Sequence, residues 1–183
     1  MKAMKRYNVW ILNAAFLFGG VSLVACSQEP TAAQKEDTKK VAQFLQKAVE
    51  TDNFGIVTGI LATDKSKAEA VGDYGMTISN VHSKTSPVLE DLAKRKYVEV
   101  SQTLPEEKKT LVANLEKSDS LSFDKEFIDV QIAAQKEAVA LYEEADKELK
   151  DAEIQSFIDQ VLPVLKEHLK EAQDLKMAMV TPK

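Results

Sequence analysis

Apolar residues recur along most of the chain at intervals of three and four positions, the spacing that places them on one face of an α-helix. The alternation at every second position that is typical of strands is absent from this part of the sequence. The pattern therefore predicts four long helices and one short helix. Their expected bounds are 36–63, 66–96, 105–117, 122–149 and 151–177, of which 105–117 is the short one.

Short connections between long amphipathic helices favour a bundle in which neighbours in the sequence alternate in direction. We therefore predict an all-α fold, a ferritin-like up-down-up-down four-helix bundle with one short extra helix between helices two and three. The bundle is expected over residues 38–178, followed by a tail over 179–183. Glycines at Gly55, Gly59, Gly72 and Gly75 predict that helices one and two approach each other closely.

The first 26 residues resemble the signal of a bacterial lipoprotein. Lys2, Lys5 and Arg6 precede an apolar stretch that ends in Leu23-Val24-Ala25-Cys26, which resembles a lipobox. We predict a signal peptide over residues 1–25 and a lipidated Cys26 that begins a flexible tether over residues 26–37. An uncleaved membrane helix is the alternative, but the stretch is short for a span.

The anchor and its neighbour predict a cellular location. Acyl chains such as palmitate on Cys26 would attach the protein to a membrane. An Asp after the lipidated Cys resembles a signal for retention in the inner membrane, so Ser27 favours the outer membrane, facing the periplasm.

Composition excludes several classes of function. The 183 residues include one Cys and two His, which excludes a disulfide framework, a multi-Cys metal site and a three-His site. The formal charge of −5 becomes −8 once residues 1–25, with three positive charges and no acid, are removed. This acidic balance argues against a nucleic-acid partner, and it leaves membrane attachment to the acyl chains.

The two histidines are the candidate functional residues. His82 and His168 fall on the apolar seams of helices two and four, at matching heights if these helices run parallel. Asp52 and Gln135 are expected at the same level, so a polar layer in the middle of the bundle is predicted. Such a layer suits a divalent metal. The alternative is that these residues are hydrogen-bonded members of the core. The Glu-x-x-His repeat of di-iron bundles is missing from the sequence.

Four segments resemble the bacterial envelope family called domain of unknown function 4142, which has a ferritin-like four-helix form. They are Ile60-Leu61-Ala62, Val81-His82-Ser83-Lys84, Ser122-Phe123-Asp124-Lys125-Glu126-Phe127, and Leu162-Pro163-Val164-Leu165-Lys166-Glu167-His168-Leu169. The resemblance implies a fold and no established reaction. Of the inward-facing polar residues of that family, this chain retains His82, Asp124 and His168. The chain has Val81 where the family carries Asp, Gln135 where it carries His, and Gly55 where it carries an acid.

No catalytic motif is present, so we expect a binding protein rather than an enzyme, with no cofactor. The predicted function is a non-catalytic, periplasm-facing lipoprotein that acts as a helical binding or structural module of the bacterial envelope. Its partners would be the membrane and an unidentified protein or small ligand. The alternative is a ferritin-like metal-binding or redox protein that holds a divalent metal with His82 and His168 and with Asp52, Asp124 or Gln135.

Overall fold

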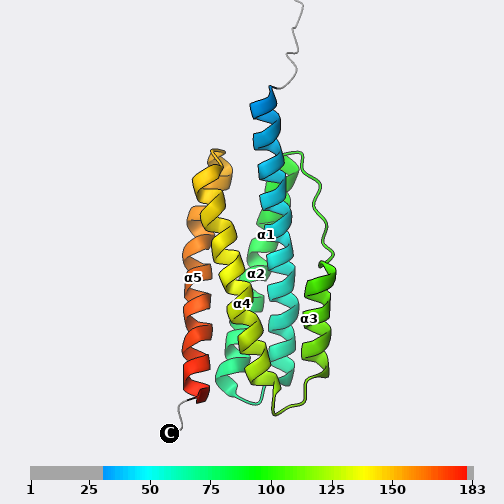
Figure 1. Cartoon of the computed structure of the whole chain (residues 1–183), viewed down its shortest axis with the longest axis vertical. Helices are drawn as coiled ribbons and strands as arrows, with labels where there is room; N and C mark the ends of the chain where they lie inside the picture. Colours follow the sequence, from blue (N-terminus) through cyan, green and yellow to red (C-terminus); the bar gives the residue numbers. More distant parts are fainter. Residues whose placement is uncertain (1–30, 181–183) are drawn as a thin grey trace, which may run out of the picture. The chain divides into compact units, whose positions relative to one another are not determined.

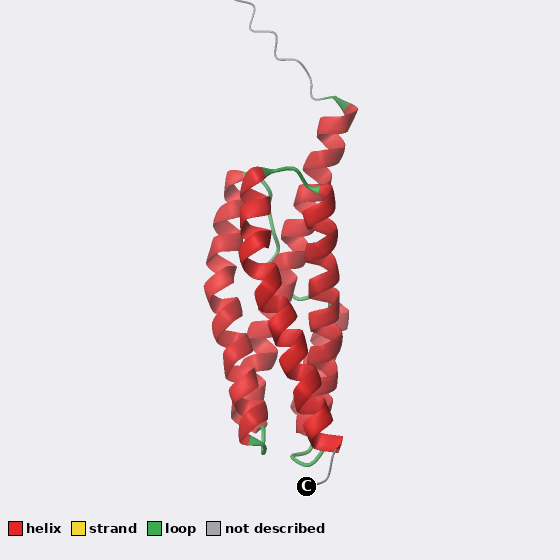
Figure 2. Cartoon of the chain, turned by 90° about the vertical axis from the view of Figure 1, so that its left-hand side faces the viewer, coloured by secondary structure: helices red, strands yellow, loops and turns green. Residues whose placement is uncertain are grey.

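The computed structural model describes residues 31–180, and this part of the chain is helical without a strand (Figure 2). Its five helices are α1 (Ala32–Lys65), α2 (Glu69–Arg95), α3 (Glu106–Lys117), α4 (Phe123–Glu148) and α5 (Ala152–Val180) (Figure 1). The all-α prediction is confirmed, and the predicted helix bounds agree to within a few residues. The predicted signal peptide and Cys26 lie outside the described residues. Within 31–180, no helix has the length and apolar character needed to cross a membrane.

The first helix begins earlier than the sequence pattern predicts. The backbone N–H of Gln34 donates to the Thr31 hydroxyl at 3.3 Å, and the backbone N–H of Thr31 donates to the Gln34 side chain at 2.8 Å. This reciprocal capping box satisfies two backbone donors at the start of α1. Residues 32–37 of the predicted tether are therefore helical. At the other end, α5 continues two residues into the predicted tail.

The four long helices pack as antiparallel neighbours. Contacts join α1 to α2 and α4, and they join α5 to α4 and α2. Lys40 at the start of α1 pairs with Glu148 at the end of α4, at 2.9 Å. Lys96 at the end of α2 pairs with Asp151 just before α5, at 2.6 Å. Consequently α2 and α4 run in the same direction, as the colours of Figure 1 also show.

The predicted alternation of helix direction is therefore wrong. The connection between α2 and α4 spans residues 96–122, and it runs back along the helices before α4 begins (Figure 1). Helix α3 belongs to this crossover. The Lys65 ammonium, at the end of α1, donates to three carbonyl oxygens at the end of α3, those of Leu115 at 3.3 Å, Glu116 at 2.6 Å and Ser118 at 3.1 Å. The sequence pattern predicted the short helix α3, but the prediction assumed that all connections between the long helices are short.

Two apolar clusters fill the space between the long helices, and buried polar residues separate them. The first cluster includes Phe44, Leu92, Tyr142 and Phe157, and the second includes Tyr74, Phe127 and Ala172. On each long helix, the buried polar side chains lie in the sequence between residues of the two clusters. These side chains are Asp52 and Thr58 on α1, His82 on α2, Gln131 and Gln135 on α4, and His168 on α5.

The predicted close approach of α1 and α2 is confirmed at two glycines. A Cβ added to Gly59 would lie 2.5 Å from the carbonyl oxygen of Gly75, and one added to Gly75 would lie 2.9 Å from that of Gly59. Real Cβ atoms do not approach backbone so closely, so the two helices need glycine here. Gly72 has no such neighbour, because its nearest contact is an ordinary 3.8 Å to Ser66.

Candidate functional site

The six buried polar side chains form a layer across the middle of the helix assembly, which we call the polar layer. Each of the six residues is at most 3% exposed. Burial at this level removes polar atoms from water, so each atom needs a partner within the protein or in a bound molecule. The positions of these partners therefore show what the layer can do. The six residues are Asp52, Thr58, His82, Gln131, Gln135 and His168.

Asp52 fixes the orientation of the His82 ring. The His82 Nδ1 lies 2.8 Å from Asp52 Oδ1, and the Thr85 hydroxyl donates to Asp52 Oδ2 at 2.6 Å. A carboxylate only accepts hydrogen bonds, so the hydrogen of the first contact is on Nδ1. In an uncharged ring, His82 Nε2 is then a bare acceptor. It is buried and has no hydrogen-bond partner among the described residues.

Gly55 provides the space that the His82 ring occupies. A Cβ added at this position would lie 2.7 Å from His82 Nε2 and 2.8 Å from Cγ, inside van der Waals contact. The ring therefore packs directly against the backbone of α1. We predicted Gly55 as a contact between helix backbones, and the structure shows that it makes room for the His82 side chain of α2.

A second chain of hydrogen bonds orients Gln131. The Thr58 hydroxyl donates to the Phe54 carbonyl at 2.7 Å, which uses its only hydrogen. The Thr58 oxygen accordingly accepts from Gln131 Nε2 at 2.8 Å. This contact holds the amide so that Gln131 Oε1 is the free end. Gln131 Oε1 and Gln135 Oε1 are both buried without a hydrogen-bond partner in the described part of the chain.

His168 lies beside His82. Their ring centroids are 6.1 Å apart, and the ring planes are inclined by 58°. Burial, and after it the neighbouring His82, lower the pKa of His168 from 6.5 to about 4, so this ring is uncharged at neutral pH. The Tyr74 hydroxyl donates to the His168 backbone carbonyl at 3.1 Å. His168 Nδ1 is a further buried atom for which residues 31–180 provide no hydrogen-bond partner.

Asp124, which the family resemblance suggested as a ligand, is not part of the polar layer. Its carboxylate accepts hydrogen bonds from the Ser66 hydroxyl at 2.8 Å and from the backbone N–H groups of Lys67 and Ala68 at 3.2 and 2.8 Å. These groups belong to the turn that enters α2, whose cap residue Ala68 has no side-chain cap of its own. Asp124 therefore holds the turn between α1 and α2 from the start of α4, through N–H groups that precede the first residue of α2. The other four predicted site residues all lie in the polar layer.

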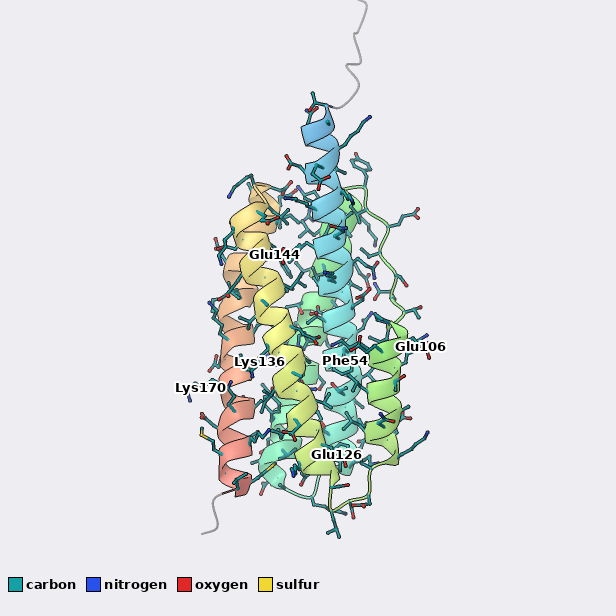
Figure 3. The ribbon with its side chains drawn as sticks, in the orientation of Figure 1. Phe54, Glu106, Glu126, Lys136, Glu144 and Lys170 are labelled. Atoms are coloured by element: carbon teal, nitrogen blue, oxygen red, sulfur yellow. The ribbon has the colours of Figure 1, made fainter. Side chains whose placement is uncertain are left out.

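A pocket of about 440 Å³ reaches the polar layer from the face formed by α1 and α4. His82, Gln131 and Gln135 line it, and its walls include the apolar side chains of Phe54 and Leu141. Figure 3 labels Phe54 on α1 and Glu144 on α4, two of the lining residues. The rim includes Lys108 of α3, whose ammonium lies 4.9 Å from the Phe54 ring centroid and 2.5 Å from Glu137.

A smaller pocket lies on the opposite side of His82, between α2 and α5. Its volume is about 160 Å³, and Thr85, Phe157 and Leu165 are among its lining residues. His82 therefore separates two pockets. Of the two, only the larger one is lined by further residues, Gln131 and Gln135, that have buried polar atoms without a hydrogen-bond partner within 31–180.

The donor set fits an all-protein metal cage poorly. Within residues 31–180 there is no group of three or more His, Cys, Asp and Glu side chains arranged to hold a metal ion. Asp52 directs its oxygens at His82 and Thr85. A metal at this level would rely on imidazole nitrogens and amide oxygens. Sequence reasoning missed Thr58 and Gln131; the position of Gln131, one helical turn before Gln135, was the available signal.

Comparison with known families gives one match. The family model "Domain of unknown function (DUF4142)" matches residues 26–175, most of the chain. No curated protein and no solved structure is significantly similar to the chain. The family description assigns no reaction, so a function has to be argued from the site itself.

Proposed function

The chain belongs to the family called Domain of unknown function (DUF4142), and we propose that it is a non-catalytic binding module of the bacterial envelope. In this proposal the pocket between α1 and α4 receives a small ligand, and an acyl anchor on Cys26 holds the protein at a membrane. The helix pairings support a ferritin-like four-helix bundle, because such bundles combine antiparallel neighbours with one long crossover.

The observation that carries the proposal is the set of unpartnered polar atoms in the pocket. His82, Gln131 and Gln135 line one pocket, and each has a buried atom, Nε2 or Oε1, without a hydrogen-bond partner among residues 31–180. An unsatisfied buried polar group costs about 1–3 kcal/mol of stability. If these side chains served only for packing, Leu at the same positions would avoid this loss of stability. The arrangement therefore fits a site whose partner is a bound molecule.

The binding proposal is tested with the full chain purified in mild detergent. Its thermal unfolding is followed with separate panels of organic cations, organic anions, neutral polyols and divalent metals. A ligand present at a hundred times its Kd adds about 2.7 kcal/mol of stability, which raises the Tm by roughly 5 °C or more in a chain of this size. We expect at least one panel to raise the Tm of the wild type and not that of Gln131→Leu. No shift with any panel would overturn the proposal.

The anchor is supported by the sequence of residues 1–26, where a basic segment and an apolar segment lead to Cys26. We expect Cys26→Ser to move the protein from the membrane fraction to the soluble fraction, with Ser27→Ala as the control that stays bound. Full retention of Cys26→Ser would contradict the anchor. In a Gram-negative host, Ser27→Asp is expected to move the protein from the outer to the inner membrane.

A metal-binding or redox protein is the second candidate, and the Asp52–His82 contact favours it. Histidines that bind metals commonly donate their other ring N–H to a carboxylate, as His82 does at 2.8 Å. His168 is near enough to take part, at 6.1 Å between ring centroids. Elemental analysis of the full chain separates the two candidates. Stoichiometric metal that disappears in the double variant His82→Ala/His168→Ala would favour the metal protein over the binding module.

A further inference from the structure

We propose that the pocket between α1 and α4 binds a protonated primary amine, the head group of an organic cation. The inference rests on the proposed binding function and adds the chemical class of the ligand. It follows from three properties of the pocket: the hydrogen-bonding character of its buried atoms, the charge behind and around them, and the apolar walls.

The residues that line the pocket have buried acceptor atoms without partners among the described residues. In an uncharged ring, His82 Nε2 is an acceptor because Nδ1 donates its hydrogen to Asp52, and Gln131 Oε1 is an acceptor left free because Gln131 Nε2 donates to Thr58. Gln135 Oε1 is the third acceptor. An alkylammonium has three N–H donors and no acceptor, which matches this set. A carboxylate or phosphate would instead bring further acceptors against them.

The charge of the layer also favours a cation. Asp52 is the one acidic residue among the buried residues of 31–180, and it is 1% exposed. No Lys or Arg side chain accompanies it in the polar layer, and the lowered pKa of His168 keeps that ring uncharged near neutral pH. Buried charges are normally paired. A ligand cation on His82 Nε2 would be separated from Asp52 by one imidazole ring and would balance its charge.

The rim of the pocket has the same bias. Its charged lining residues are three acids and two lysines, and one of these lysines, Lys108, is already paired with Glu137 at 2.5 Å. The remaining charged residues of the lining are two acids, Glu50 and Glu144, and one lysine, Lys47, which leaves an excess of one negative charge. An excess of negative charge at an opening raises the local concentration of cations and of their encounters with the site.

The walls indicate that the amine carries a carbon chain. The volume of about 440 Å³ is within the range of small-molecule sites and exceeds what an ammonium group fills. Phe54, Ala134 and Leu141 contribute apolar surface to it. These side chains would cover the methylene groups of the ligand while its head reaches the three acceptors.

The chain provides a direct readout, because it contains only two histidines. The full chain, labelled with ¹⁵N-histidine and purified in mild detergent, is titrated with n-butylammonium chloride. We expect the His82 Nε2 signal to start at the position of a bare ring nitrogen and to move, saturably, toward that of a hydrogen-bonded one. His168 should shift less. A His82 Nε2 that is already protonated before any amine is added would overturn the proposal.

Variants locate the site. Loss of one hydrogen bond to a charged group costs about 1.5–3 kcal/mol, so Gln131→Leu is expected to weaken n-butylammonium binding roughly tenfold or more. Gln135→Leu serves the same purpose if Gln131→Leu fails to fold. Gln173→Leu is the matched control, because Gln173 is exposed on α5 and lines neither of the two pockets beside His82. Equal affinity in the pocket variants and the control would place the amine elsewhere and overturn the proposal.

Matched probes separate failure of this inference from failure of the proposed function. n-Butyltrimethylammonium keeps the charge and the chain without an N–H donor, butyrate reverses the charge, and 1-butanol removes it. Zinc tests the metal alternative. Movement of His82 Nε2 with any of these and not with n-butylammonium would overturn the amine and leave a binding function in place. If no probe moves either ring and the wider panels leave the Tm unchanged, both proposals fail.

Discussion

The side chains of the polar layer and of the first apolar cluster are equally buried, but they differ in whether their buried atoms have partners. Tyr142 in the cluster is 1% exposed, and Gln131 in the layer is 0% exposed. Tyr142 meets Phe44 edge to face with ring centroids 5.2 Å apart, and Phe157 at 6.1 Å. The layer instead leaves buried acceptors without partners. Burial alone therefore does not distinguish a core from a site; the pairing of the buried atoms does.

The largest expected effect tests the apolar side of this comparison. Tyr142→Ala removes a fully buried ring, and substitutions of this kind cost about 3–5 kcal/mol because the cavity relaxes only in part. We expect the free energy of unfolding, measured by urea denaturation, to fall by that amount. Glu144→Ala, nearby on the same helix, is the control and should change it by less than about 1 kcal/mol. A similar small loss for Tyr142→Ala would show that the cluster is not tightly packed.

The second prediction concerns pH, to which the layer should respond and the cluster should not. The pKa of His168 is about 4 in the folded chain and near 6.5 when unfolded, so the unfolded state binds the proton first as pH falls. The stability that depends on the uncharged ring is complete above pH 6.5 and is lost progressively between 6.5 and 4. At pH 4.5 this amounts to about 2.5 kcal/mol.

The comparison that isolates this contribution uses His168→Gln. Urea denaturation at pH 7 and pH 4.5 should show a smaller loss of stability in the variant, by about 2.5 kcal/mol, than in the wild type. Tyr142→Ala should keep the full pH dependence of the wild type. Identical pH profiles for wild type and His168→Gln would mean that His168 is solvated or paired.

The smallest expected effect has the opposite sign. Gln135→Leu replaces a buried amide whose oxygen has no hydrogen-bond partner, so we expect the free energy of unfolding to rise by about 1 kcal/mol. Thr58→Val removes a paired group from the same layer and should lower it by about 1–2 kcal/mol, since Gln131 loses its partner. Urea denaturation of both variants checks the contrast. A loss of stability with Gln135→Leu would show that this glutamine is structural.

The sequence was sufficient to place the helices and to bring four polar residues to one level. That level was predicted with the wrong relative direction for α2 and α5. The result survived because His82 is at the midpoint of α2 and His168 is near the middle of α5, and reversing a helix leaves its midpoint at the same height. Reversing a helix does move residues near its ends, such as Asp124, to the opposite end of the bundle.

The features that sequence reasoning missed depend on contacts between helices. The importance of Gln131 comes from Thr58, which lies 73 positions earlier on another helix. The crossover was missed because residues 96–122 include a short amphipathic helix, which has the same local pattern whether it turns the chain or carries it back. The spacing of Gln131 from Gln135 was the one local signal, and the rest of both features is decided by packing of distant segments.

The attachment of α3 to Lys65 links the crossover to the rim of the larger pocket. Helix α3 contributes Lys108 to the rim of the larger pocket, while three of its carbonyl groups, at the opposite end from the rim, are held by one ammonium. The position of Lys108 at the rim therefore depends in part on Lys65, a side chain at the far end of α3 that does not line the pocket.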